Sequence, residues 1–88
     1  LTSAHRNPSH PQTTLEYAVS SAGLWQIDTY DARGALVRRL VDGVVPAGSH
    51  SMVWTGTDQA GRTVGSGIYF VRMTAGAHAE TRKIVMLK

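Results

Sequence analysis

The sequence contains no cysteine, which excludes three kinds of chemistry at once. Disulfide bonds, zinc sites built on thiolates and cysteine nucleophiles are all impossible in this chain. Charged residues are also scarce, at 17% against about 25% in an average soluble protein, while hydrophobic residues reach 42%. A disordered chain has the opposite balance, low hydrophobicity and high charge, so the composition favours a folded domain.

Long apolar runs and clusters of positive charge are missing too. No apolar run approaches the roughly 18 residues of a transmembrane helix, so direct membrane insertion is not expected. The net charge is +3, but the Lys and Arg residues are spread along the chain, so no nucleic-acid partner is expected. With 88 residues, the chain is long enough for one small domain, whose thin core leaves little room for a catalytic cleft.

The sequence also lacks the motifs of catalysis and metal binding. His5, His10, His50 and His78 match no short spacing of metal ligands. No serine lies in a Gly-x-Ser-x-Gly elbow, and Gly65-Ser66-Gly67 lacks the third glycine of a dinucleotide-binding fingerprint. The sequence therefore predicts a protein that is not an enzyme and that uses neither a cofactor nor a metal.

What the sequence does contain is a series of short strand patterns. Alternating apolar and polar residues, or runs of β-branched and aromatic residues, predict strands over residues 13–19, 24–30, 35–41, 50–55, 68–74 and 81–87, with a short strand starting at Val64. The segments 31–34 and 58–61 both read Asp-x-x-Gly, which is typical of tight turns, and residues 42–48 are predicted to form a loop. We predict an all-β, immunoglobulin-like antiparallel β-sandwich of about seven strands.

The polar N-terminal segment sets the expected domain boundary. Residues 1–12 carry Pro8 and Pro11, each of which fixes its own φ and restricts the residue before it. We interpret residues 1–12 as an extended linker from an upstream domain and residues 13–88 as the sandwich.

Six stretches resemble, in order and spacing, a known type of C-terminal module. They are Asn7-Pro8 with Pro11–Tyr17, Tyr30–Gly34, Gly48–Trp54, Asp58–Arg62, Ser66–Phe70 and Lys83–Lys88. Together they make the chain similar to the C-terminal sorting domains of type IX secretion substrates and to the immunoglobulin-like domain of the flagellar hook-cap protein. The chain departs from this pattern at Ser9-His10, where Phe-Asn is usual, and at Thr29, where Val is usual.

The resemblance implies a β-sandwich at the C-terminal end of a larger exported bacterial protein, outside the cell or on its surface. In type IX substrates, such a module is read by the outer-membrane translocon, and the cargo is attached to surface polysaccharide. The motif positions proposed for sorting or partner binding are Gly67, Tyr69, Lys83 and Lys88. The lysines offer a receptor a charged handle, and the glycine and tyrosine set the strand geometry behind it.

Two of the aromatic residues are expected in the hydrophobic core, and one is expected to form a contact at the surface. Trp25 shares a strand face with Ile27, and Trp54 shares one with Met52, so both tryptophans are predicted to be core. Tyr30 lies on the opposite face from Trp25 and is the candidate for an exposed contact.

Two predicted strands are apolar on both faces, at Ile68–Val71 and at Ile84–Leu87. A half-buried antiparallel strand is expected to alternate instead. One interpretation is that a loop or an upstream domain covers the second face, and the other is that this apolar surface is left for a partner. Lys83 and Lys88 bracket the last strand in the way that protects exposed edges from aggregation.

These observations leave three functional hypotheses. The first is a non-catalytic secretion signal or cell-surface anchor, whose partner is a translocon or a surface component. The second is a structural self-assembly module, like a hook cap or a filament, in which copies pack through the exposed apolar strands. The third is a carbohydrate-binding accessory domain.

The self-assembly hypothesis predicts association of the purified chain, because the apolar second faces would be covered by other copies. Light scattering over a wide range of concentrations measures this directly. A monomer at the highest concentration would count against this hypothesis.

Overall fold

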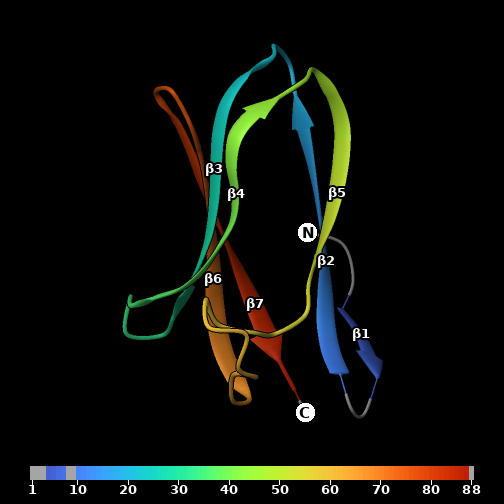
Figure 1. The fold of residues 1–88 in the computed structure, drawn as a ribbon, viewed down its shortest axis with the longest axis vertical. Helices are drawn as coiled ribbons and strands as arrows, with labels where there is room; N and C mark the ends of the chain where they lie inside the picture. The colour runs from blue at the N-terminus through green and yellow to red at the C-terminus, as the bar shows by residue number, and fades with distance from the viewer. Residues whose placement is uncertain (1–3, 8–9, 88) are drawn as a thin grey trace.

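The computed structural model describes the backbone of residues 4–7 and 10–87 and the side chains of residues 12–87. Every regular element in these residues is a β-strand (Figure 1). The strands are β1 (Ala4–Asn7), β2 (His10–Val19), β3 (Gly23–Asp31), β4 (Leu36–Val45), β5 (Gly48–Trp54), β6 (Gly67–Ala75) and β7 (His78–Met86). Among the described residues, no helix has the length and hydropathy needed to span a lipid bilayer.

The strands form two sheets that pack face to face. One sheet has the order β1-β2-β5 and the other has the order β4-β3-β6-β7. All neighbouring strands run antiparallel. Figure 1 shows the chain crossing between the two layers at the β2–β3 and β4–β5 connections, at the top of the view. The predicted all-β antiparallel sandwich is therefore confirmed.

Alternation along the strands brings one apolar face of each sheet into the interior. On β6, for example, Tyr69, Val71 and Met73 are buried, while Ile68 and Arg72 between and beside them are exposed. The buried core consists of Leu15, Ile27, Trp54, Tyr69, Val71, Met73, Ile84 and Met86. The interior thus holds a single apolar layer, to which both sheets contribute.

Trp54, at the end of β5, is the largest fully buried side chain. Its ring meets the ring of Tyr69 edge to face, with the ring centres 5.4 Å apart, so it joins the three-stranded sheet to the four-stranded one. Its indole Nε1 donates a hydrogen bond to the carbonyl oxygen of Thr57 at 2.9 Å. The prediction that Trp54 is core is confirmed, and the same side chain fixes the start of the 55–66 connection.

The two Asp-x-x-Gly segments form the predicted turns. Asp31 and Asp58 each accept, through Oδ1, hydrogen bonds of 2.9–3.0 Å from the backbone N–H groups two and four residues later. These bonds, led by the one from the fourth residue, hold the pKa of both carboxyls below the ordinary value. Gly34 and Gly61 complete the turns with φ of +85°, a left-handed conformation that glycine adopts without strain.

The N-terminal segment differs from a simple linker where it is described. Ala4–Asn7 pairs with β2 from His10 to Thr13, so the three-stranded sheet begins before residue 13. Pro11 lacks an N–H, but it lies in the part of β2 that pairs with β1 alone. The other edge of the strand has no neighbour there that would need a hydrogen bond from an N–H group. Residues 1–3 and 8–9 lie outside the described residues, and a connection to an upstream domain stays a prediction.

The predicted loop at residues 42–48 is wrong except at Pro46 and Ala47, and Gly48 already belongs to β5. β4 continues to Val45, because Gly23 to Gln26 of β3 supply ladder partners for Asp42 to Val45. Pairing with β3 thereby overrides the turn-forming character of Asp42 and Gly43. The predicted short strand at Val64 is also absent, and its place is taken by one isolated bridge between Thr57 and Thr63.

Two isoleucines of the four-stranded sheet give a matched test of the core. Ile84 is 2% exposed and Ile68 is 43% exposed. Ile84→Ala is expected to lower the free energy of unfolding by about 3 kcal/mol, because it leaves a cavity between the sheets. Ile68→Ala is expected to lower it by about 0.5 kcal/mol or less. Urea denaturation measures both, and equal losses would contradict the assignment of inner and outer faces.

Two tyrosines provide a second matched pair. The hydroxyl of Tyr69, a residue 8% exposed, donates to the carbonyl oxygen of Gly65 at 2.7 Å. Tyr30 is half-buried, and its hydroxyl has no hydrogen-bond partner among the described residues. Tyr69→Phe is expected to cost about 1 kcal/mol of unfolding free energy, and Tyr30→Phe to cost close to nothing. Thermal or urea unfolding checks this, and a larger loss from Tyr30→Phe would refute it.

Candidate functional site

The outer face of the four-stranded sheet carries a row of large side chains from all four strands. Tyr30 on β3 lies opposite Leu36 on β4 and opposite Phe70 on β6, and Phe70 lies opposite Lys83 on β7. Residues directly opposite each other on one face of a sheet have Cβ atoms about 5 Å apart. The register therefore brings together Tyr30 and Lys83, two residues that the sequence analysis singled out, with Phe70 between them.

Aliphatic side chains extend this row on the same face. Ile68 lies opposite Val85 in the adjacent row, and these two residues are 43% and 49% exposed. Leu36 is 52% exposed. We call the following set the outer apolar patch: Tyr30, Leu36, Ile68, Phe70 and Val85. Exposed apolar surface of this kind, continuous across several strands, is typical of sites that contact another protein.

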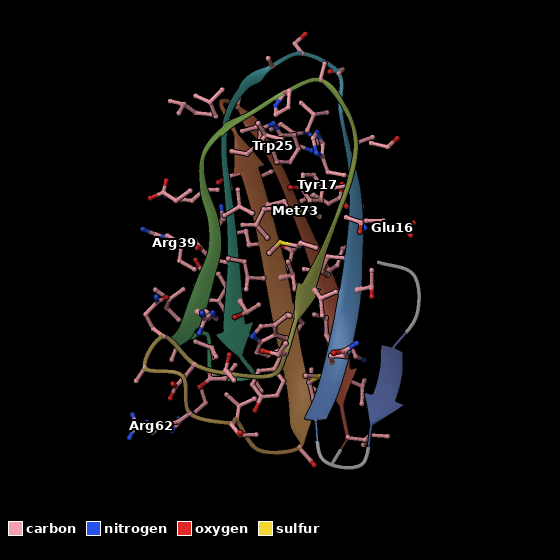
Figure 2. All side chains as sticks on the ribbon, turned by 45° about the vertical axis from the view of Figure 1, so that its right-hand side comes forward. Glu16, Tyr17, Trp25, Arg39, Arg62 and Met73 are labelled. Carbon is pink, nitrogen blue, oxygen red and sulfur yellow. The ribbon has the colours of Figure 1, made fainter. Side chains whose placement is uncertain are left out.

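A charged row borders the patch. Asp28 of β3 is buried and accepts from Arg39 of β4 through two contacts, Nε to Oδ1 at 2.9 Å and Nη2 to Oδ2 at 3.5 Å. The hydrogen bond to Asp28 raises the pKa of Arg39. Figure 2 shows Arg39 on the outside of the sandwich. Arg72 of β6 lies opposite Asp28 on the other side, but the carboxylate is already engaged by Arg39.

A shallow depression of about 310 Å³ lies where the two rows meet. It is lined by Tyr30, Gly34, Phe70, Arg72 and Thr81. Gly34 belongs to the Asp-x-x-Gly turn, and an added Cβ there would meet no heavy atom within 4 Å. The depression therefore has an aromatic wall and one cationic wall, and it is open to solvent at the turn.

The opposite end of the sandwich holds a cluster of rings. Tyr17 lies 5.7 Å from Trp25 and 5.4 Å from His50, and Trp25 lies 6.1 Å from His78, all between ring centres. Figure 2 shows Tyr17 and Trp25 between the two sheets. Trp25 is half-buried and packs against the core, so its prediction as a core residue is confirmed only in part. Two larger hollows, of about 560 and 590 Å³, flank this cluster. The first is lined by Glu16, Tyr17, His50 and Arg82 together with three small residues, and the second is lined mostly by small residues.

His50 and His78 make separate polar contacts, and the side chains of His5 and His10 lie outside the described residues. The Nε2 atom of His50 lies 2.7 Å from the carbonyl oxygen of Pro46, and the Nε2 atom of His78 lies 4.0 Å from a carboxylate oxygen of Glu80. Among residues 12–87, no three His, Asp or Glu side chains are grouped so that they could hold a metal ion.

The remaining predicted site residues fall in different places. Tyr69 is buried, so its side chain is not available to a partner; burial and the charge of Asp31 raise the pKa of its phenol. Gly67 is the first residue of β6, opposite Met86. Lys83 is exposed on the outer face, and Lys88 lies outside the described residues. A role for Gly67 and Tyr69 in strand geometry, and for the lysines in recognition, stays a prediction.

Sequence reasoning did not name Arg72 or Leu36, and it considered Phe70 only as one of several aromatic residues and as part of the apolar segment Ile68–Val71. The signal that could have found Phe70 was present, because Ile68–Val71 is apolar on both faces. The structure resolves this pattern. Tyr69 and Val71 are buried, whereas Ile68 and Phe70 belong to the outer apolar patch, which no described segment covers.

Comparisons with known proteins identify the family. The family model described as FlgD Ig-like domain matches residues 6–78. Two solved structures of FlgD are similar to the chain: one from P. aeruginosa, with 22% identity and a TM-score of 0.66, and one from Xanthomonas campestris, with 28% identity and a TM-score of 0.64. Each alignment covers 85% of this chain, but the chain spans only 59% and 55% of those two structures. A comparison with curated proteins gives no match.

These findings confirm the predicted immunoglobulin-like fold. They also separate the two resemblances seen in the sequence, because they support the hook-cap domain and give no support to the type IX sorting domain. The chain belongs to the FlgD Ig-like domain family.

Proposed function

We propose that this domain is a non-catalytic structural module that binds another protein subunit of an extracellular assembly. The binding surface is the outer apolar patch on the four-stranded sheet. The observation that carries this proposal is that half-buried aromatic and exposed aliphatic side chains from β3, β4, β6 and β7 share the outer face of one sheet.

The family supports a structural role for this domain. The structure of Xanthomonas campestris FlgD is described as giving insights into hook capping essential for flagellar assembly. Because the chain spans about half of that protein, a role in hook capping is part of the proposal for this chain. The location outside the cell belongs to the same proposal. The secretion-signal and surface-anchor hypothesis has no comparable support.

The sheet provides a rigid platform for such a contact. The outer side chains stand on strands whose inner side chains are locked in the core, so little conformational entropy is lost when a partner docks. Aromatic residues near the centre of an interface tend to carry much of its binding energy. Tyr30 and Phe70 occupy this central place, with Lys83 and Arg72 beside them at the polar border.

A chimaera tests the proposal. The part of Xanthomonas campestris FlgD that the chain matches is replaced by this chain, and hook assembly is scored by electron microscopy and swimming. The chimaera is expected to assemble hooks, and Val85→Asp is expected to abolish assembly, because it places a charge in the outer apolar patch.

Val53→Asp is the matched control. Val53 is 45% exposed and lies on the outer face of the other sheet, on β5, whereas Val85 is 49% exposed. This control is expected to leave assembly intact, and circular dichroism of the purified chains verifies that both variants fold. If Val85→Asp assembles hooks as well as the unaltered chimaera does, the patch is not the binding surface.

A further inference from the structure

Most of the carboxylates of this chain are neutralised within the domain. The chain has six Asp and Glu residues. Four of them pair with arginine, in the pairs Asp28–Arg39, Asp31–Arg33, Asp58–Arg62 and Glu80–Arg82. The other two, Glu16 and Asp42, are exposed on different sheets, so the described residues contain no acidic cluster.

The cations are distributed differently. Arg38 is held by the hydroxyl of Thr57 and by the carbonyl oxygen of Asp58. Among residues 12–87, this leaves Arg72 and Lys83 as the basic side chains with neither an ion pair nor a hydrogen bond. Both lie on the outer face of the four-stranded sheet, and they flank the same residue, Phe70. Two positive charges that no carboxylate pairs with, those of Arg72 and Lys83, thus lie beside the half-buried ring of Phe70.

The depression places one of these charges next to an apolar surface. Its walls are Tyr30 and Phe70 on the apolar side and Arg72 on the charged side. An apolar side chain of a partner fits against the aromatic wall, and a carboxylate next to it reaches the guanidinium. Hydrogen bonds between arginine and a carboxylate are stronger than neutral ones and select a defined geometry.

A second copy of the same face does not satisfy this surface. A twofold contact buries the same patch of two copies against itself, so it would bring Arg72 and Lys83 of both copies into one interface without an unpaired carboxylate from that patch. Like charges that meet in an interface disfavour the complex. The other faces of the chain offer no compensating acidic cluster in the described residues, since Glu16 and Asp42 stand apart.

We infer that the outer face of the four-stranded sheet docks an acidic segment of a different protein chain. The segment places an apolar side chain against Tyr30 and Phe70 and carboxylates on Arg72 and Lys83. This inference rests on the proposed function, because it specifies the chemistry of the subunit that the outer apolar patch binds.

Peptide titration of the isotope-labelled chain tests the inference by NMR. The probe is a synthetic peptide with one phenylalanine flanked by aspartates and glutamates, and two matched peptides replace either the phenylalanine by alanine or the acidic residues by lysines. The acidic aromatic peptide is expected to shift amide signals of β3, β6 and β7 around Phe70. Binding is expected to be lost in about 1 M salt, where the Debye length falls to about 3 Å.

Paired variants locate the charges. The double variant R72A/K83A is expected to bind the acidic peptide about tenfold more weakly, as the loss of two ion pairs predicts. The control is R62A, which removes an exposed arginine at the Asp58–Gly61 turn, and its affinity is expected to equal that of the wild type. Equal binding of the lysine peptide, shifts confined to another face, or no binding of the acidic peptide would each overturn the inference.

The chimaera separates this inference from the proposed function. In one outcome, the chimaera carrying R72A/K83A assembles hooks as well as the unaltered chimaera, while the chimaera carrying Val85→Asp does not. Docking through the patch is then supported, and the inference that the partner is acidic is wrong. If Val85→Asp has no effect, the proposed function fails on its own account.

Discussion

The packing of Trp54 between the two sheets is the contact on which the rest of the structure depends. The indole belongs to the three-stranded sheet, is 1% exposed and meets the ring of Tyr69 on the four-stranded sheet. A domain of 88 residues has one thin apolar layer, so a single large side chain supplies much of it. The hydrogen bond from the indole to Thr57 also sets where the chain leaves β5 for the long connection to β6.

The outer face follows from this inner packing. Once Tyr69 and Val71 are buried beneath Trp54, the period of the strand obliges Ile68, Phe70 and Arg72 to point outward. The same alternation occurs on β7, where Ile84 and Met86 are buried and Val85 is exposed. The apolar outer surface is therefore held at fixed positions by the core beneath it.

Much of the fold could be predicted from local patterns. The turns at Asp31 and Asp58 were predicted because Asp at the first position and Gly at the fourth suit a type I turn followed by a left-handed residue. The strand patterns identified most of the strands. The length of β4 could not be predicted, since residues 42–45 extend only because β3 offers them partners. The pairing of Ala4–Asn7 with β2 was missed for the same reason, as a ladder hydrogen bond depends on a neighbour that the local sequence does not specify.

The candidate site, too, could be predicted only in part from the sequence. By itself, the sequence determined that this is an all-β sandwich, that Trp54 is core, that Tyr30 faces away from Trp25, and that two strands are apolar on both faces. These properties depend on the period of the side chains along one strand. Only the tertiary structure decided that Tyr30, Phe70 and Lys83 lie in one row and that Asp28 is taken by Arg39 rather than by Arg72. Strand order and register set these neighbours, and both are determined by packing between segments that lie far apart in the chain.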